Sequence, residues 1–409
     1  MPRGRGPGFW CGRRSIINFG LRWNTLSLNP YRIFFPLGIL FGLMGVGEWV
    51  LWTVGWKIPN IAISHAAFQS QGFLLCFVVG FLMTAFPRFT GTDPAAKHEL
   101  ILMLVASVVF FVLEWRKLWL PAQVSYLFLI INLIIFAARR IPRRNKDLPQ
   151  SFLLMGFGFL HALLGSSIIV GTGFGTSNFA LFSTGRQMVQ LGFLLCMVLG
   201  VTGKLAPFLF GYTDDPERDA EKKNWIQSGR AAIVVHGLTG AAIMASFFID
   251  TYSLRAGAGV RAVFATFHLL TYARIARPLR KKTTLMFFFF LSCWMIPVGL
   301  WVGFLWPGIR IAALHIIFLG GFSLIIFSFG LLIVLSHSMQ AALINSKLIP
   351  LKFVGTFLLA ALTFRLLAEF YSAKYALMLH FSSGFWVLAA LVWGGFAFPK
   401  FFGSSNSQH

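Results

Sequence analysis

The sequence predicts an all-α polytopic membrane protein, and three observations support this fold class. Hydrophobic residues make up 57% of the 409 positions and charged residues only 11%, which is too few charges to cover a soluble protein of this size. The apolar residues gather in runs of about 20, the helix length that crosses a hydrocarbon core about 30 Å thick. The net charge of +23 comes from short basic clusters between these runs, a pattern typical of membrane orientation rather than of a nucleic-acid partner.

Twelve apolar runs are predicted to cross the lipid bilayer, within a transmembrane domain of residues 33–398. In chain order they cover residues 33–56, 66–87, 99–115, 119–138, 150–171, 187–208, 230–250, 259–277, 284–305, 311–335, 351–371 and 376–398. Residues 1–32 form a predicted basic extension without the apolar region of a cleavable signal, and residues 399–409 form a short tail. An even number of crossings places both termini on one side.

The distribution of Lys and Arg predicts which side this is. With the N-terminus in the cytoplasm, roughly three times as many basic residues fall in the inner connections as in the outer ones. Loops rich in Lys and Arg stay on the cytoplasmic side of a membrane. The sequence therefore predicts that both the N-terminal extension and the C-terminal tail are cytoplasmic.

A duplicated stretch predicts an internal repeat. Residues 72–91 read GFLLCFVVGFLMTAFPRFTG and residues 192–211 read GFLLCMVLGVTGKLAPFLFG, with nine identities in twenty positions. The copies are 120 positions apart, so the repeated unit contains four of the twelve helices. The same spacing places a third copy in 311–335. We therefore predict three repeats of four helices, in which the second helix of each unit lines the inside of a bundle.

Two histidines lie near the outer ends of such inner helices. His65 precedes the run 66–87 and His315 begins the third copy, so both are expected at one depth and facing each other. Two imidazoles in this arrangement can take both axial positions of a haem iron, and we predict a haem at His65 and His315. For each histidine alone, the alternative is an interfacial side chain bonded to headgroups or loop carbonyls.

Five other histidines are candidate metal ligands. His380 shares the predicted depth of His65 and His315, and His236 lies in the inner half of 230–250. His161 and His268 lie near mid-membrane, where an ionisable group is costly unless it faces the bundle interior; a satisfied core histidine is the alternative for both. His337 is about 33 Å from His315 along one helix, so any metal at His337 belongs to a second centre.

Glu48 is the carboxylate deepest inside an apolar run. A charged carboxylate is expensive to bury, so Glu48 is expected to be protonated, paired, or part of a proton or ion route. The last case supports a second function, a secondary transporter built from repeats. Units of four helices, rather than the six usual in twelve-helix transporters, count against that function.

Several motifs occur in the order found in one known family. They are PYRIFF at 30–35, the stretch from His65 that ends in GFLMTAFPRFTG at 80–91, GKLAPF at 203–208, and His315 followed 22 positions later by His337. From about residue 30 to 345 the chain resembles the NnrS family. In the family pattern, a second histidine and an acid stand where this chain has Ala67 and Phe68, so the expectation of copper rests on fewer ligands than that of haem.

The resemblance to the NnrS family also implies a setting. It implies a bacterial inner-membrane protein that contains haem and copper and serves denitrification and the nitric oxide stress response, with nitric oxide or a redox protein as partner. It assigns no reaction. Catalysis is therefore not part of the main expectation, and a haem-dependent redox activity is the enzymatic alternative.

Overall fold

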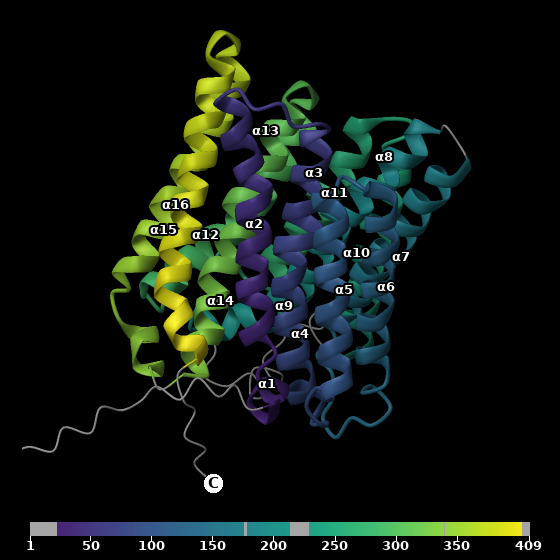
Figure 1. Cartoon of the computed structure of the whole chain (residues 1–409). Coiled ribbons are helices and arrows are strands. Elements are labelled where there is room, and N and C mark those ends of the chain that lie inside the picture. The colour runs from purple at the N-terminus through teal and green to yellow at the C-terminus, as the bar shows by residue number, and fades with distance from the viewer. Residues whose placement is uncertain (1–22, 176–177, 213–228, 339, 403–409) are drawn as a thin grey trace, which may run out of the picture.

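The computed structural model describes residues 23–175, 178–212, 229–338 and 340–402, and every regular element in these ranges is helical (Figure 1). The α-helices are α1 (Trp23–Leu28), α2 (Tyr31–Thr53), α3 (Ile61–Ala67), α4 (Leu75–Thr90), α5 (Lys97–Trp115), α6 (Trp119–Ala138), α7 (Phe152–Gly175), α8 (Phe179–Gln187), α9 (Phe193–Leu209), α10 (Gly229–Ile249), α11 (Leu254–Thr271), α12 (Thr284–Leu305), α13 (Arg310–His315), α14 (Leu324–Ser336), α15 (Ile349–Phe370) and α16 (Tyr375–Phe402). Short 3₁₀ turns precede α13, α15 and α16.

Within the described ranges, eleven helical stretches are long and apolar enough to span a membrane. This confirms the prediction of an all-α membrane protein. The segment predicted at 259–277 is also helical, but as α11 it runs from Leu254 to Thr271 and is not among the eleven. Arg255 and Arg261 lie in α11 and lower its mean hydropathy.

The ends of the neighbouring helices show that α11 nevertheless runs between the two faces of the bundle. Gln150, just before α7, donates to the carbonyl of Gly229 at the start of α10 over 3.1 Å. The backbone N–H of Arg280, just before α12, donates to the carbonyl of Phe210 at the end of α9 over 3.2 Å. The start of α7 and the end of α9 lie on one face of the bundle, so the starts of α10 and α12, which contact them, lie on that face too. After α10 has crossed the bundle, α11 must therefore cross back before α12 begins.

The helices close into a ring around an inner group. In succession, α2 packs on α4, α7 on α9 and α12 on α14; α5 pairs with α6, α10 with α11 and α15 with α16. The ring is joined by α6 against α7, α11 against α12 and α16 against α2. The stretches that contain α4, α9 and α14 are the three most buried of the eleven, so the segments expected to line the inside do lie there. Three copies of one unit remain a prediction.

Each of these three inner stretches contains a π-helical segment. The segments are Phe68–Leu74 (η1), Met188–Gly192 (η2) and Ile316–Ser323 (η6), and each joins the short outer helix to the longer inner one. Segments of π-helix are rare and often mark functional sites. His315 directly precedes η6, and His65 lies three positions before η1.

Two glycines from the duplicated stretch lie at close contacts between helices. A Cβ atom at Gly72 would lie 2.9 Å from the ring of Phe41, and one at Gly192 would lie 2.3 Å from the ring of His161. Small residues at these positions let neighbouring membrane helices pack backbone against side chain. The identity of Gly72 and Gly192 in the alignment therefore reflects a shared packing requirement.

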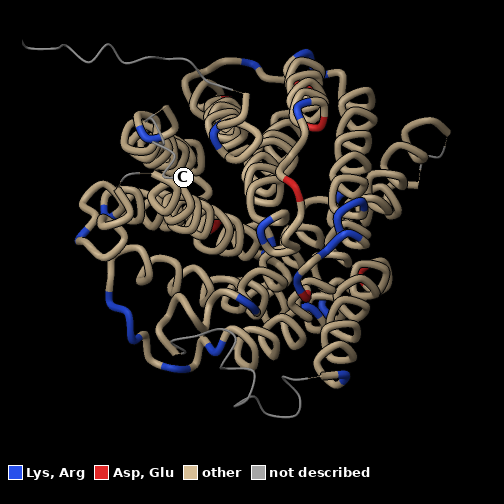
Figure 2. The backbone as a smooth tube through the Cα atoms, turned by 90° about the horizontal axis from the view of Figure 1, so that it is seen from below, with Lys and Arg blue, Asp and Glu red and all other residues tan. Residues whose placement is uncertain are grey.

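The described chain begins and ends on one face of the bundle (Figure 1). The ring of Tyr31, at the start of α2, lies 6.2 Å from that of Phe401 in the last turn of α16 and 5.7 Å from that of His337 after α14. Figure 2 is seen from this face and shows Lys and Arg mainly at helix ends and in connections. This arrangement agrees with an even number of crossings.

Candidate functional site

His65 is held in one tautomer by the neighbouring helix. It lies on α3, and its Nδ1 is 2.9 Å from the carbonyl oxygen of Gly45 on α2. Because a carbonyl oxygen only accepts, Nδ1 carries the proton and Nε2 keeps its lone pair. The side chain is half-buried, and Nε2 has no hydrogen bond to any residue that the structure describes.

His315 has the same arrangement on the opposite inner helix. It is the last residue of α13, and its Nδ1 donates to the carbonyl of Ile311, one turn earlier, over 2.7 Å. Its Nε2 therefore also carries the lone pair, and the side chain is half-buried like that of His65. A bond from Nδ1 to a backbone carbonyl is what usually orients a metal-binding histidine.

A buried cation joins these two imidazoles. His315 interacts electrostatically with His65, and both interact with Arg365 on α15, the helix that packs on α13 and η6. Arg365 is 6% exposed and pairs with Glu369 at 3.7 Å, as its position one turn away predicts, but its Nη1 has no hydrogen-bond partner. Arg365 is therefore a buried cation on the helix that packs against α13, the helix that carries His315.

Glu48 lies beside this group and is paired. Its carboxylate accepts a hydrogen bond from Ser64 over 3.0 Å and forms an ion pair with Lys117. Lys117, in the loop between α5 and α6, also donates to Ser64 over 2.5 Å. Both contacts of Glu48 use Oε1, and its Oε2 is buried without a hydrogen-bond partner. Of the three states expected for Glu48, the paired one is the state found in the structure.

A second cluster lies between α10 and α11. The ring centroids of His236 and His268 are 5.3 Å apart, and Tyr272 lies 4.2 Å from the first and 4.9 Å from the second. Nε2 of His268 donates to the carbonyl of Leu199 over 2.9 Å. Both histidines are almost fully buried, and the Nδ1 atom of each has no hydrogen-bond partner, which is uncommon for buried polar atoms.

His161 has the contacts of a core residue. It is fully buried on α7, its Nδ1 donates to the carbonyl of Phe157 over 2.7 Å, and its ring packs against Phe247 and Cys196. Its Nε2 is buried without a hydrogen-bond partner, so His161 is only partly satisfied, and both its core role and its role as a ligand stay predictions. In the described ranges, no group of three or more His, Cys, Asp and Glu side chains is placed to hold a metal ion.

Comparison with known protein families identifies the chain. A family model described as NnrS protein matches residues 25–404. The chain belongs to the NnrS family. The match contains every membrane-spanning stretch of the structure, and it confirms the resemblance carried by the four motifs. No curated protein was found to match this NnrS sequence.

The position where this NnrS protein departs from the family pattern is filled by apolar packing. Ala67 and Phe68 are both buried, and the ring of Phe68 packs against Phe41 and Phe111. A Cβ at Gly45 would lie 2.6 Å from the Cβ of Phe68. The space that a second histidine and an acid would need is therefore occupied, and this part of the chain offers no ligand.

The two remaining candidate histidines lie apart from the His65–His315 pair. Nδ1 of His380, on α16, is 2.9 Å from the hydroxyl of Thr53 at the end of α2. His337 lies on the opposite face, where its Nδ1 donates to the carbonyl of Ile333 over 2.9 Å and burial lowers its pKa. As expected from its spacing, His337 cannot share a site with His315.

Three side chains around these sites escaped sequence reasoning. They are Arg365, Lys117 and Tyr272, which no motif or spacing in the sequence connects with the histidines. The pairing of His236 with His268 did leave a signal. His236 lies 13 residues before the end of α10 and His268 lies 14 residues after the start of α11, so an antiparallel hairpin brings them side by side.

Proposed function

We propose that this NnrS protein binds haem in the inner membrane, with His65 and His315 as the two axial ligands. The observation that carries the proposal is the shared state of the two imidazoles. Each donates Nδ1–H to a backbone carbonyl and leaves Nε2 for iron. The proposal places both termini in the cytoplasm, in keeping with the distribution of basic residues.

The charged residues near His65 and His315 are also suited to a haem. A haem carries carboxylates, and a buried guanidinium suits a carboxylate because it can donate charge-assisted hydrogen bonds; Nη1 of Arg365 lies 3.7 Å from Glu369 and makes no hydrogen bond at present. The carbonyls of Gly45 and Ile311 would orient the ligand rings, and the Glu48–Lys117 pair would keep the charge next to His65 balanced. When bound, the haem would supply one-electron redox chemistry, and a diatomic ligand would bind the iron by displacing one of the two imidazoles.

These properties suit the role that the resemblance implies, in denitrification and the nitric oxide stress response. The protein's own residues would hold and orient the group, and the resemblance assigns no reaction to it. We therefore propose a haem protein that binds nitric oxide or exchanges electrons with a redox partner, rather than one with an assigned catalytic cycle.

The reduced-minus-oxidised visible spectrum of the detergent-purified protein, combined with a pyridine haemochrome assay, tests this proposal. We expect sharp low-spin bands and a stoichiometry of at least one haem per chain, because two imidazole ligands give six-coordinate iron. A colourless protein purified from haem-replete cells would overturn the proposal.

Arg365 provides a second test. Replacing Arg365 with leucine is expected to weaken haem binding by roughly 10–100-fold, because a charge-assisted hydrogen bond contributes about 1.5–3 kcal/mol. The readout is the rate of haem transfer to an apo-globin acceptor. The low-spin spectrum of the bound fraction should be unchanged, since both axial ligands remain, and Arg365→Lys should lose less. Equal transfer rates in all three proteins would contradict the role of Arg365.

Among the described residues, His236 and His268 form a pair of histidines suited to supply two of the ligands of a copper ion. The Nδ1 atoms of His236 and His268 lack partners and share one cluster, and imidazole nitrogen suits copper. We propose this pair, with Tyr272, as the copper ligands, and metal analysis of the same preparation is the test. Copper at one equivalent that is lost in His236→Ala supports the assignment; copper retained by that variant contradicts it.

Secondary transport, the alternative function, gains no support from Glu48. Its ion pair with Lys117 explains a buried acid without a proton or ion route. Substrate-dependent proton flux in liposomes that disappears in Glu48→Gln would restore this alternative.

A further inference from the structure

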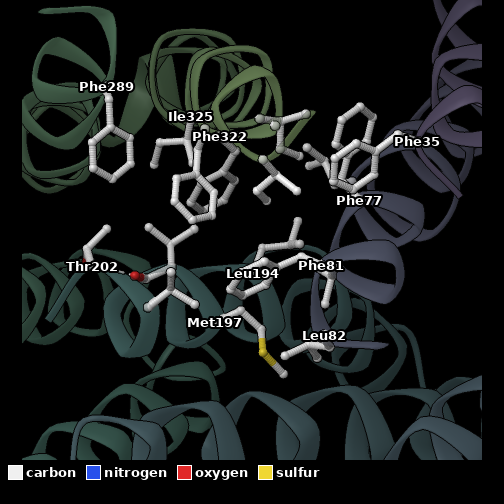
Figure 3. A pocket seen from close by; sticks show the side chains of 18 of the residues that line it. Phe35, Phe77, Phe81, Leu82, Leu194, Met197, Thr202, Phe289, Phe322 and Ile325 are labelled. Atoms are coloured by element: carbon white, nitrogen blue, oxygen red, sulfur yellow. Dashed lines mark hydrogen bonds between the residues drawn. The ribbon is translucent and has the colours of Figure 1, made fainter. Parts of the chain in front are cut away.

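The inner helices α4, α9 and α14 supply most of the lining of a partly open cavity of about 90 Å³. Figure 3 shows that its lining side chains converge from these helices, with Phe77 and Phe81 on one side, Leu194 and Met197 on another, and Phe322 and Ile325 on the third. The polar lining is a single hydroxyl, that of Thr202, which donates to the carbonyl of Val198 over 2.7 Å. The cavity wall therefore offers no free hydrogen-bonding group.

The cavity lies on the same helices as the two half-buried histidines, below the π-helical segments. Its lining begins at Leu74, nine residues after His65, and at Phe322, seven residues after His315. At about 1.5 Å per residue, this places its upper end about 10–14 Å from the histidines, toward the face where the described chain begins.

The chemistry of the wall decides what the cavity can hold. A buried water molecule needs two to four polar partners, so an apolar space of this kind stays dry. Its volume is smaller than the ~150 Å³ apolar cavity known to take benzene or xenon. A lipid acyl chain or a quinone is too large, which leaves small apolar molecules.

We propose that this cavity is a binding site for a single small apolar gas molecule, in the size range from a diatomic molecule to xenon. The site is formed wholly by side chains of the membrane bundle and needs no cofactor. It therefore stands or falls independently of the haem proposed at His65 and His315.

Crystals of the full chain pressurised with xenon test the proposal, with the anomalous signal as the readout. We expect one xenon peak among α4, α9 and α14. Val201 lines the cavity on α9 and Ile326 lines it on α14, so Val201→Phe and Ile326→Phe should each abolish the peak by filling the space. Val234→Phe is the matched control, because Val234 is 58% exposed on the outer surface of α10.

Because the two cavity-filling substitutions lie on different helices, the test can still be read if one of the two variants fails to fold. The parent and Val234→Phe should show the peak, and either folded filling variant should lack it. The absence of xenon from the cavity of the parent would overturn the proposal. So would ordered water or detergent in the cavity, or a xenon peak of equal height in a filling variant.

Discussion

Replacing either His65 or His315 with alanine is expected to abolish the low-spin haem spectrum of the protein. If both imidazoles bind one iron, the loss of either leaves it without an axial ligand, and bis-imidazole coordination cannot form. The two variants should therefore lose the same bands to the same extent. The measurement is the reduced-minus-oxidised spectrum, normalised to protein, with the haemochrome assay reporting the amount of haem that remains.

Matched controls come from the other histidines. His98 is exposed in the first turn of α5, and His380 is engaged with Thr53, so His98→Ala and His380→Ala should keep the parent spectrum. Loss of the bands in only one of the two ligand variants would contradict a haem shared by α3 and α13. Loss of the bands in His380→Ala would move one ligand to α16.

Replacing Arg261 with leucine is expected to lower the free energy of unfolding by about 3–5 kcal/mol, the usual cost of leaving a buried charge without its partner. Arg261 on α11 is 4% exposed and forms an ion pair of 2.9 Å with Asp250, which is also buried. It donates to Ser246 over 3.0 Å, and its guanidinium lies 4.6 Å from the ring of Phe247. The leucine variant keeps the volume but strands the carboxylate.

The double variant Arg261→Leu/Asp250→Leu separates charge from packing. Replacing both partners of a buried pair with apolar residues is often neutral or stabilising, so the double variant should recover most of the lost stability. Arg255→Leu, an exposed position on the same helix, should change stability by no more than about 1 kcal/mol. Denaturant or thermal unfolding in one detergent measures all three, and a double variant no more stable than Arg261→Leu would contradict this account.

The membrane fold was predictable because it depends on local composition. Runs of about 20 apolar residues are visible in the sequence, and all twelve predicted segments are helical in the structure. The limits of α11 were predicted less well. The predicted run, 259–277, begins five residues after the start of α11 and ends six residues after its end. Arg255 lies in the first turn of α11, outside the predicted run, whereas Arg261 lies within both and forms an ion pair with Asp250, just after α10.

The residues of the candidate site could be predicted only where a sequence pattern included them. The duplicated stretch led to His65 and His315, because equivalent helices occupy equivalent places. The sequence does not connect Arg365 with these two histidines. Arg365 lies outside the duplicated stretch, and its position depends on how α15 packs against α13. Lys117 was missed for a related reason: it is an outer-loop residue whose side chain reaches into the membrane region to meet Glu48.

The π-helical segments give the inner helices a property that depends on the number of residues rather than on their identity. A π-helical turn holds more residues than an α-helical one, and each residue of an α-helix turns the chain by about 100°. Each residue of η1 therefore turns the chain by less than about 100°. Removing one residue and closing η1 to a regular α-helix changes the rotation in two opposite senses that largely cancel, so His65 would keep nearly its present direction relative to the cavity-lining face of α4. The wide turn thus lets η1 hold one more residue between His65 and α4 than an α-helix would, without turning the histidine away.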